Sequence, residues 1–523
     1  MRTSACSLAC AALLLPGLSA ASTAPAAAGG PTKPPATPKP PCPHPPKPPK
    51  ELVTSEKLQE LITIEGLLAG ASKLQAIADA NGGHRAFGSG GHNQTVDYLF
   101  DTLSSLNYYT VTKQPFVELF SGGTSDLVVD GSEVPSKIMT YTPSGSLEAP
   151  LVKVANLGCA PEDYPAEVAG AIALISRGEC AFAAKSTGAK TAGAVGAIVY
   201  NNAEGVISGT LGEASDNYVP IVGITQAAGQ ALLTALEAGE VTAKLDVEVI
   251  EENRTTYNVI AETKGGDHDN VLVLGGHTDS VLDGPGINDD GSGTIGVLNV
   301  AIALSKFKVK NAIRFGFWSA EEFGLLGSYA YMKSLNSSEA EVAKMRGYLN
   351  CDMIASPNYI YGIYDGNGDA FGLTGPAGSD VIEKDFEDFF ASKGVPSVPT
   401  EFSGRSDYAA FIENGVPSGG LFTGAEGIMT EEEAALFGGV AGEPYDVNYH
   451  APGDTIDNLA LDAFLLNTKA IAHSVAKYAN SFDSLPPVNP VQRRWSADRA
   501  QFNKRADAHH HGHSGPCGEK AHK

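Results

Sequence analysis

The chain has 523 residues, of which 43% are hydrophobic, and 60 acidic against 36 basic residues give it a formal net charge of −24. This length exceeds a single typical domain, so we expect two folded domains with tails. The negative charge argues against nucleic acid and anionic membrane surfaces as partners, because both repel an acidic protein.

Residues 1–22 have the layout of a secretory signal peptide. Arg2 precedes the apolar run LACAALLLPGL, and small residues follow from Ser19 to Ser22. Pro16 interrupts this run, which is too short to span a bilayer, and no later stretch has about 18 uninterrupted apolar residues. We therefore expect a secreted, extracellular protein without a membrane anchor, with the vacuole as the alternative destination.

An exported chain meets an oxidising compartment, so its cysteines are expected to pair. Removal of the signal leaves an odd number of cysteines, so at least one thiol stays unpaired within a monomer. Cys159 and Cys180 lie close together in one segment and are the best disulfide candidates, whereas Cys351 falls in an apolar strand and is predicted to be buried. Cys42 and Cys517 lie in tails, and their pairing stays open. Export also predicts N-glycans at three Asn-X-Ser/Thr triplets, which begin at Asn93, Asn253 and Asn336.

Low-complexity segments flank the predicted folded part. Residues 23–53 are dominated by Pro, Ala, Thr and Lys, which cannot bury apolar surface, so they are predicted to form an extended linker or a pro-segment. Residues 485–523 form a polar, His-rich tail. Its histidines are predicted to be solvated and to lie outside the ordered metal site.

Residues 54–134 are predicted to form the N-terminal part of the main domain. After Ser55, an apolar-periodic stretch predicts a helix with one apolar side, made of Leu58, Leu61, Ile62 and Leu67. A second helix is predicted over 95–106.

Residues 135–248 change to short apolar runs separated by Gly and acidic turns, which predicts a small strand-rich insert. The segment GAIALISRGECAFAAKSTGAKTAGAVGAIVYNN, followed by VPIVGIT, resembles a protease-associated (PA) domain, an accessory module of several peptidases. The insert contains no catalytic constellation, so we expect a cover or a substrate-access module, with structural padding as the alternative.

Residues 249–484 alternate strand-like and helix-like patterns, which predicts an α/β domain with a mixed, largely parallel sheet flanked by helices. The polar motif residues fall where the predicted strands end. Ligand sites in open α/β sheets lie outside the carboxyl ends of the strands. We therefore expect these side chains to meet at one edge of the sheet.

Five segments of this domain each present an isolated His, Asp or Glu: GGHTDSV, GINDDGSGT, WSAEEFGLLGS, LNCDMI and YHAPGDT. Zinc prefers imidazole nitrogen and carboxylate oxygen, and two zincs about 3.5–4 Å apart need one bridging carboxylate. The sequence therefore predicts a two-zinc site whose candidate ligands are His277, Asp289, Glu322, Asp352 and His450.

Each motif also has an ordinary structural interpretation. Asp279, two residues after His277, could accept a hydrogen bond from the second ring nitrogen of that histidine and so fix its tautomer. Asp289 fits a turn cap as well as a metal ligand, and a lone loop residue such as His450 is often only a polar surface group.

Adjacent carboxylates at Glu321 and Glu322 repel each other unless a cation compensates or one of them is protonated. In a metallohydrolase one of the pair could bind zinc while the other accepts a proton from water. The alternative is a solvated helix N-terminus. Asp352 is predicted to interrupt the strand GYLNCDMI, where a carboxylate is costly unless it is paired or coordinated.

In this order and spacing, the motifs resemble the M28 peptidases, co-catalytic zinc enzymes that include bacterial and fungal secreted aminopeptidases. The resemblance covers roughly 255–480, and the layout of signal, N-terminal segment, insert and peptidase domain is similar to fungal secreted leucine aminopeptidases and vacuolar aminopeptidase Y. It implies that Asp289 bridges the two zincs, with His277 and Asp352 on one ion and Glu322 and His450 on the other.

The same resemblance assigns the remaining roles. It makes Glu321 the general base, with Asp279 supporting His277, Tyr449 donating to the substrate oxyanion and Arg405 contacting the substrate; an ordinary surface salt bridge is the alternative for Arg405. It implies two Zn2+ per subunit and an aminopeptidase in which a zinc-bridging hydroxide releases N-terminal residues, Leu or other apolar ones, from peptides with a free N-terminus.

Several alternatives stay open. A carboxypeptidase or dipeptidase could use the same scaffold, and glutaminyl cyclase shares the fold with one zinc. A receptor-like relative without catalysis is a rival from another class, although every ligand position here is filled. We expect a monomer, and the side-chain preference and the processing of the pro-segment are left open.

Overall fold

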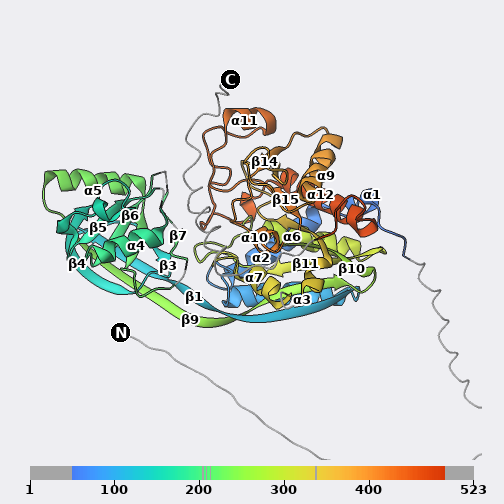
Figure 1. Cartoon of the computed structure of the whole chain (residues 1–523), viewed down its shortest axis with the longest axis horizontal. Helices are drawn as coiled ribbons and strands as arrows, with labels where there is room; N and C mark the ends of the chain where they lie inside the picture. The colour runs from blue at the N-terminus through green and yellow to red at the C-terminus, as the bar shows by residue number, and fades with distance from the viewer. Residues whose placement is uncertain are drawn as a thin grey trace, which may run out of the picture. The chain divides into compact units, whose positions relative to one another are not determined.

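The computed structural model describes residues 50–178, 180–202, 205–207, 209–212, 214–335 and 338–488 (Figure 1). The signal, most of the Pro-rich segment, nearly all of the C-terminal tail, Cys42, Cys517 and Asn336 lie outside these residues.

The strands are β1 (Tyr109–Val129), β2 (Ser132–Glu133), β3 (Lys137–Thr140), β4 (Gly145–Lys153), β5 (Ile172–Ser176), β6 (Gly196–Tyr200), β7 (Gly209–Thr210), β8 (Ile221–Ile224), β9 (Thr242–Thr263), β10 (Asp267–His277), β11 (Asn311–Trp318), β12 (Met345–Cys351), β13 (Gly362–Tyr364), β14 (Val398–Thr400) and β15 (Ser418–Phe422).

The α-helices lie before, between and after these strands. They are α1 (Ser55–Gln59), α2 (Ile64–Asp79), α3 (Gly90–Ser105), α4 (Phe182–Thr191), α5 (Gln226–Ala238), α6 (Gly291–Leu304), α7 (Leu326–Leu335), α8 (Glu339–Ala343), α9 (Ser379–Ser392), α10 (Tyr408–Ile412), α11 (Glu431–Phe437) and α12 (Leu461–Asn480). None of the described helices is both long and apolar enough to cross a membrane.

The main sheet has the order β14-β13-β15-β12-β10-β11-β9. Strand β10 is parallel to both β11 and β12, and β12 is parallel to β15, whereas β9 runs antiparallel to β11. This mixed, largely parallel sheet with flanking helices confirms the predicted fold class.

Helices pack on both faces of the main sheet, and the side chains of β10 show why. Leu272 and Leu274 join a core with residues of α2, α6 and α12, whereas Val271 and Val273 face a second core with residues of α7 and α10. Successive side chains of a strand point to opposite faces, so a strand that is buried on both sides must be apolar throughout.

The N-terminal segment differs in detail from the sequence prediction. Two helices replace the single predicted one, because the first ends at Gln59 and Thr63 caps a new helix by accepting a hydrogen bond from the Gly66 N–H at 3.2 Å. Leu61 lies in the break between the two helices and is 37% exposed, so its predicted burial is wrong, whereas the other three apolar positions are buried. Ser89 caps α3, which therefore begins five residues before the predicted 95–106 helix.

Two long strands connect the main sheet to the strand-rich insert. β1 and β9 pair antiparallel along their whole length, from Tyr109 opposite Thr263 to Val129 opposite Ala243 (Figure 1). β9 pairs with β11 near one end and with β4 near the other, where β5, β6 and β8 continue the sheet. The insert also contains the disulfide between Cys159 and Cys180, while Cys351 is free and buried, as expected.

Candidate metal centre

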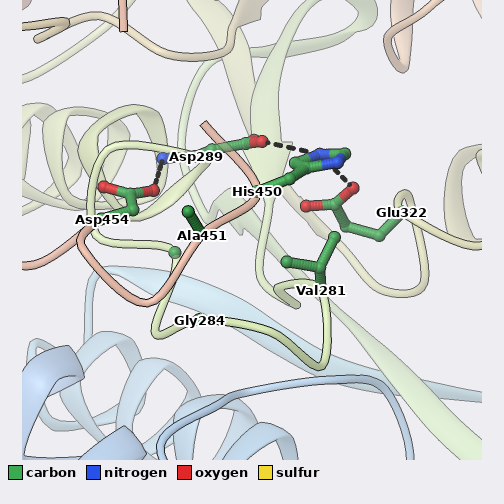
Figure 2. A pocket seen from close by; sticks show the side chains of 8 residues that line it. Val281, Gly284, Asp289, Glu322, His450, Ala451 and Asp454 are labelled. Carbon is green, nitrogen blue, oxygen red and sulfur yellow. Dashed lines mark hydrogen bonds and ion pairs between the residues drawn. The ribbon is translucent and has the colours of Figure 1, made fainter. Parts of the chain in front are cut away.

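Asp289 lies between two imidazole rings, those of His277 and His450, and Figure 2 shows its contact with His450. Its Oδ1 is 3.1 Å from Nε2 of His277, and its Oδ2 is 3.2 Å from Nε2 of His450. His277 is the last residue of β10, whereas His450 lies in the loop that precedes α12. The chain therefore brings two histidines that are far apart in sequence to the two oxygens of one carboxylate.

The adjacent carboxylates of Glu321 and Glu322 face different partners. Oε2 of Glu322 is 2.9 Å from Nε2 of His450, while Oε2 of Glu321 is 3.8 Å from Nε2 of His277. Both residues follow β11, at the carboxyl end of the strand. The backbone N–H of Glu321 donates to Oδ1 of Asp279 at 3.1 Å, which fixes the start of this turn.

Asp352 completes the group from the neighbouring strand. Its Oδ1 lies 3.8 Å from Nε2 of His277, and its Oδ2 accepts a hydrogen bond from the hydroxyl of Ser406. β12 ends at Cys351, so Asp352 follows the strand and does not interrupt it as predicted. The parallel pairing of β10 and β12 places both of their C-terminal residues at one edge of the sheet.

Three residues at the site have left-handed backbone conformations. The φ angles are 59° for Ala320, 47° for Met353 and 54° for His450. This region is sparsely populated by residues other than glycine, and such conformations persist where the surrounding structure enforces them. Each of the three residues either belongs to the site or adjoins a residue that does.

Asp290 caps α6, which separates its role from that of Asp289. Its Oδ1 accepts from the N–H groups of Gly293 at 2.8 Å and Met353 at 3.1 Å, and its Oδ2 accepts from the N–H of His277 at 3.0 Å. The turn cap considered for Asp289 therefore belongs to the next residue, and Asp289 is left to face the imidazoles. The peptide bond that joins the two aspartates is cis.

Asp454 holds Asp289 from the other side. Its Oδ2 accepts from the Asp289 N–H at 3.0 Å (Figure 2). Its Oδ1 accepts from the Asn288 N–H at 2.8 Å. The side-chain amide of Asn288 donates to Asp446 at 2.7 Å. Sequence reasoning assigned no role to Asp290, Asp446 or Asp454; the proximity of Asp454 to His450 in YHAPGDT was the available signal.

The predicted hydrogen bond from His277 to Asp279 is not formed. Nδ1 of His277 is 3.7 Å from Oδ1 of Asp279, beyond hydrogen-bonding distance, and this nitrogen has no hydrogen-bond partner. Oδ1 of Asp279 accepts instead from the Glu321 N–H. In this structure Asp279 orients the glutamate turn, and its proximity to the imidazole is electrostatic.

Tyr449 and Arg405 form one unit beside His450. The rings of Tyr449 and His450 stack with centroids 3.8 Å apart, and the Arg405 guanidinium donates to the Tyr449 hydroxyl at 3.1 Å. Arg405 also pairs with Glu426 at 2.9 Å. The two residues expected near the substrate therefore lie together, although Tyr449 belongs to the loop that carries His450 and Arg405 to the segment before α10.

The electrostatics reflect a buried excess of carboxylates. Burial raises the pKa values of Glu321 and Glu322, and it raises the pKa of Asp352 to about 6. Burial would also raise the pKa of Asp289, but the hydrogen bonds with His277 and His450 lower it. Charged carboxylates at this density need a cation nearby.

The donor set fits a metal ion. Oxygen and nitrogen atoms of His277, Asp289 and Glu322 lie within 4.8 Å of one another, as do those of His277, Asp290 and Asp352. Oε1 of Glu322 and Nδ1 of His277 are buried without a hydrogen-bond partner. Imidazole nitrogen and carboxylate oxygen are ligands that zinc accepts.

A small pocket opens beside these groups (Figure 2). Its polar lining comes from Asp289, Glu322, His450 and Asp454, and Val281, Gly284, Gly286 and Ala451 complete it. Three of the candidate ligands, Asp289, Glu322 and His450, therefore line this pocket directly.

Two family models match the chain, and both agree with the resemblances found in the sequence. Peptidase family M28 matches residues 258–475, and the PA domain matches residues 147–232. The chain is 55% identical over 473 residues to probable leucine aminopeptidase 2 of Aspergillus fumigatus, an alignment that covers 90% of this chain and 93% of that protein. It is 49% identical over 464 residues to leucine aminopeptidase 2 of Arthroderma otae, covering 88% and 93%.

Solved structures show the same fold. The aminopeptidase from Aneurinibacillus sp. strain AM-1 superposes with a TM-score of 0.64 at 28% identity, covering 84% of this chain and 100% of that chain. BSAP, a zinc aminopeptidase from Bacillus subtilis, gives a TM-score of 0.64 at 26% identity, covering 79% and 95%. With relatives of this identity and coverage, the chain belongs to peptidase family M28 and carries a PA domain as an insert.

Proposed function

We propose that this M28 peptidase is an exported zinc aminopeptidase that holds two zinc ions and releases leucine and other apolar residues from the free N-termini of peptides. The observation that carries the proposal is the position of Asp289, whose two carboxylate oxygens lie 3.1 and 3.2 Å from two different imidazoles. A carboxylate that faces two separate ligand groups fits a bridge between two metal ions.

The other candidate ligands divide between the two histidines. Asp352 lies near His277, and Glu322 lies near His450. We assign His277, Asp352 and Asp289 to one zinc, and His450, Glu322 and Asp289 to the other. When bound, zinc lowers the pKa of water and polarises the substrate carbonyl.

Glu321 is the proposed general base. Its side chain is 10% exposed, and its Oε2 lies 3.8 Å from Nε2 of His277, at the border of the ligand cluster. It accepts a proton from the attacking water and returns it to the leaving amine. The Asp279 carboxylate accepts a hydrogen bond from the backbone N–H of Glu321, so Asp279 supports the base in this proposal.

Tyr449 and Arg405 act on the developing negative charge. The Tyr449 hydroxyl donates a hydrogen bond to the substrate oxyanion, and Arg405 orients that hydroxyl from a distance of 3.1 Å. The carboxylates around the cluster favour a substrate with a free α-amino group, because opposite charges attract across a poorly hydrated site.

Export and specificity are supported by sequence. The signal-like segment 1–22, the Cys159–Cys180 disulfide and the exposed asparagines Asn93 and Asn253 of two glycosylation triplets fit a secretory route to the medium or to a vacuole. The relatives named leucine aminopeptidase 2 support leucine as a substrate residue.

The test is a panel of fluorogenic amino-acid amides with free and with blocked N-termini, assayed with chelator and then with added zinc. We expect cleavage of free-amine substrates, highest for leucine, that chelator abolishes and zinc restores, with two zincs per chain by metal analysis. Cleavage of blocked peptides from the C-terminus would favour a carboxypeptidase, and activity untouched by chelator would refute the metal assignment.

A further inference from the structure

Arg85 is a fully buried arginine that the reaction scheme does not use. It lies between α2 and α3, and its side chain is 0% exposed. Its Nε donates to the carbonyl oxygen of Pro285 at 2.8 Å, and its two terminal nitrogens donate to the carbonyl oxygens of Thr278 and Gly286. Its backbone N–H donates to the hydroxyl of Ser280 at 2.8 Å.

All four acceptors belong to one short segment, residues 278–286, which joins two of the candidate ligands. Thr278 directly follows His277, and Gly286 lies three residues before Asp289. A guanidinium group is planar and rigid, and it presents several donors in fixed directions. Arg85 therefore fixes both ends of the segment relative to each other.

The close fit at Gly286 shows how tightly this segment is held. Gly286 has a φ of 61°, and a Cβ built there would lie 2.3 Å from the carbonyl oxygen of Asp289 and 3.2 Å from a terminal nitrogen of Arg85. No larger residue fits between the guanidinium and the aspartate backbone without a shift. The position of Arg85 is thus transmitted directly to the backbone of Asp289.

The charge of Arg85 also opposes the acidic cluster. The carboxylates that interact with its guanidinium belong to Asp279, Asp454, Asp290 and Asp289. A buried charge is costly unless it is compensated, and here three carbonyl oxygens and the nearby carboxylates supply the compensation. An arginine stays charged, so it balances these acids whether or not a metal is present.

We propose that Arg85 is a positioning residue for the metal centre: it holds the 278–286 segment so that the His277 imidazole and the Asp289 carboxylate are set before zinc binds. The inference rests on the proposed two-zinc function. The hydrogen bonds of Arg85 go to the 278–286 segment and not to a candidate ligand side chain, so it positions the ligands through the backbone that carries two of them.

The test compares zinc affinity in three full-length variants with the wild-type enzyme. Arg85→Lys keeps the charge but cannot reproduce the three-way planar contact. Ser280→Ala removes the acceptor of the Arg85 N–H together with the hydroxyl's own contact with the Gly284 carbonyl oxygen at 2.9 Å, and it leaves the guanidinium contacts in place. It keeps the assay informative if Arg85→Lys does not fold. Arg314→Lys is the matched control, because Arg314 is a largely buried arginine of β11, 14% exposed, that pairs with Glu262 and Tyr331.

Zinc affinity is measured by competition with a chromophoric chelator, and kcat and KM for leucine amide are measured at low and at saturating zinc. We expect the zinc dissociation constant to rise about tenfold or more in Arg85→Lys, and by less in Ser280→Ala. The kcat of Arg85→Lys should be low at low zinc and should recover partly with added zinc, with KM nearly unchanged. Arg314→Lys should keep wild-type zinc affinity.

Wild-type zinc affinity in both Arg85→Lys and Ser280→Ala would overturn the inference. An equal loss of zinc affinity in Arg314→Lys would also overturn the inference, because the weaker binding would then reflect a general loss of protein stability. If the wild-type enzyme itself bound no zinc or hydrolysed leucine amide without metal, the proposed function would fail first, and the two failures are therefore distinguishable.

Discussion

Replacing Glu321 and Glu322 separately by glutamine tests whether adjacent carboxylates have different roles. The two side chains are nearly equally buried, at 10% and 5% exposure, so the two substitutions have similar structural costs. Glutamine has the same shape as glutamate but carries no charge and does not act as a base at neutral pH. A difference in zinc content or turnover between the two variants therefore shows that the two carboxylates have different roles in the site.

Glu321→Gln should keep its zinc and lose turnover. The backbone N–H that anchors this residue to Asp279 is unaffected by the change, and the contacts of Asp289 and Glu322 with the histidines are kept. Loss of a general base lowers the rate by about 10²- to 10⁴-fold, which corresponds to about 3–5 kcal/mol of transition-state stabilisation. The fall should appear in kcat, with little change in KM.

Glu322→Gln should instead lose metal. Its carboxylate lies 2.9 Å from Nε2 of His450, and its second oxygen is buried without a partner, so the substitution removes charge from a candidate ligand. The assay measures kcat on leucine amide together with zinc content after gel filtration. A Glu321→Gln enzyme with kcat within tenfold of wild type, or with the zinc loss of Glu322→Gln, would refute the division of roles.

Three further predictions concern other parts of the molecule. Tyr449→Phe keeps the ring that stacks on His450 but removes the hydroxyl, so kcat should fall by about 10²- to 10³-fold at unchanged zinc content; a kcat equal to that of wild type would contradict an oxyanion role. Replacing Cys159 and Cys180 by serine opens a cross-link with a sequence separation of 21, and calorimetry should show the insert destabilised by about 3 kcal/mol while kcat on leucine amide is kept. Burial lowers the pKa of His92 to about 4, so the stability that its neutral form provides is present above about pH 6.5 and is lost as the pH falls toward 4. His92→Gln should reduce this acid sensitivity by up to about 3 kcal/mol, measured as urea midpoints between pH 7 and pH 4, and an unchanged pH slope would count against it.

The sequence was sufficient to predict which side chains meet, because strand patterns carry positional information. His277 and Asp352 follow apolar runs that form parallel neighbours, and parallel strands end at the same edge of a sheet. Glu321 and Glu322 follow the strand on the other side of β10 by the same logic. The positions of the predicted strand ends therefore placed four of the site residues at one edge of the sheet.

Other features depend on tertiary contacts that no local pattern encodes. Asp279 is close enough in sequence to support His277, yet it accepts from the Glu321 N–H, because the turn after β11 brings that donor closer. From sequence, the turn cap was considered at Asp289 and no role was assigned to its neighbour Asp290. Only the path of α6 decides that Asp290 accepts from the Gly293 N–H.

The N-terminal segment shows why the family match understates the peptidase unit. The M28 model covers residues 258–475, but Leu67 and Leu74 of α2 share one hydrophobic core with Ile295 and Leu298 of α6. A Cβ on Gly70 would lie 2.6 Å from the Ile295 side chain, so these helices pack at close range.

The same segment reaches the metal centre. It supplies Arg85, which holds both ends of the 278–286 segment, and His92, whose Nε2 lies 2.9 Å from the hydroxyl of Thr278. A chain that began at the family boundary would expose one face of α6 and leave carbonyl oxygens of this segment without donors, each a destabilising change. The 54–134 segment is therefore part of the machinery that shapes the site, although none of its residues is among the candidate ligands.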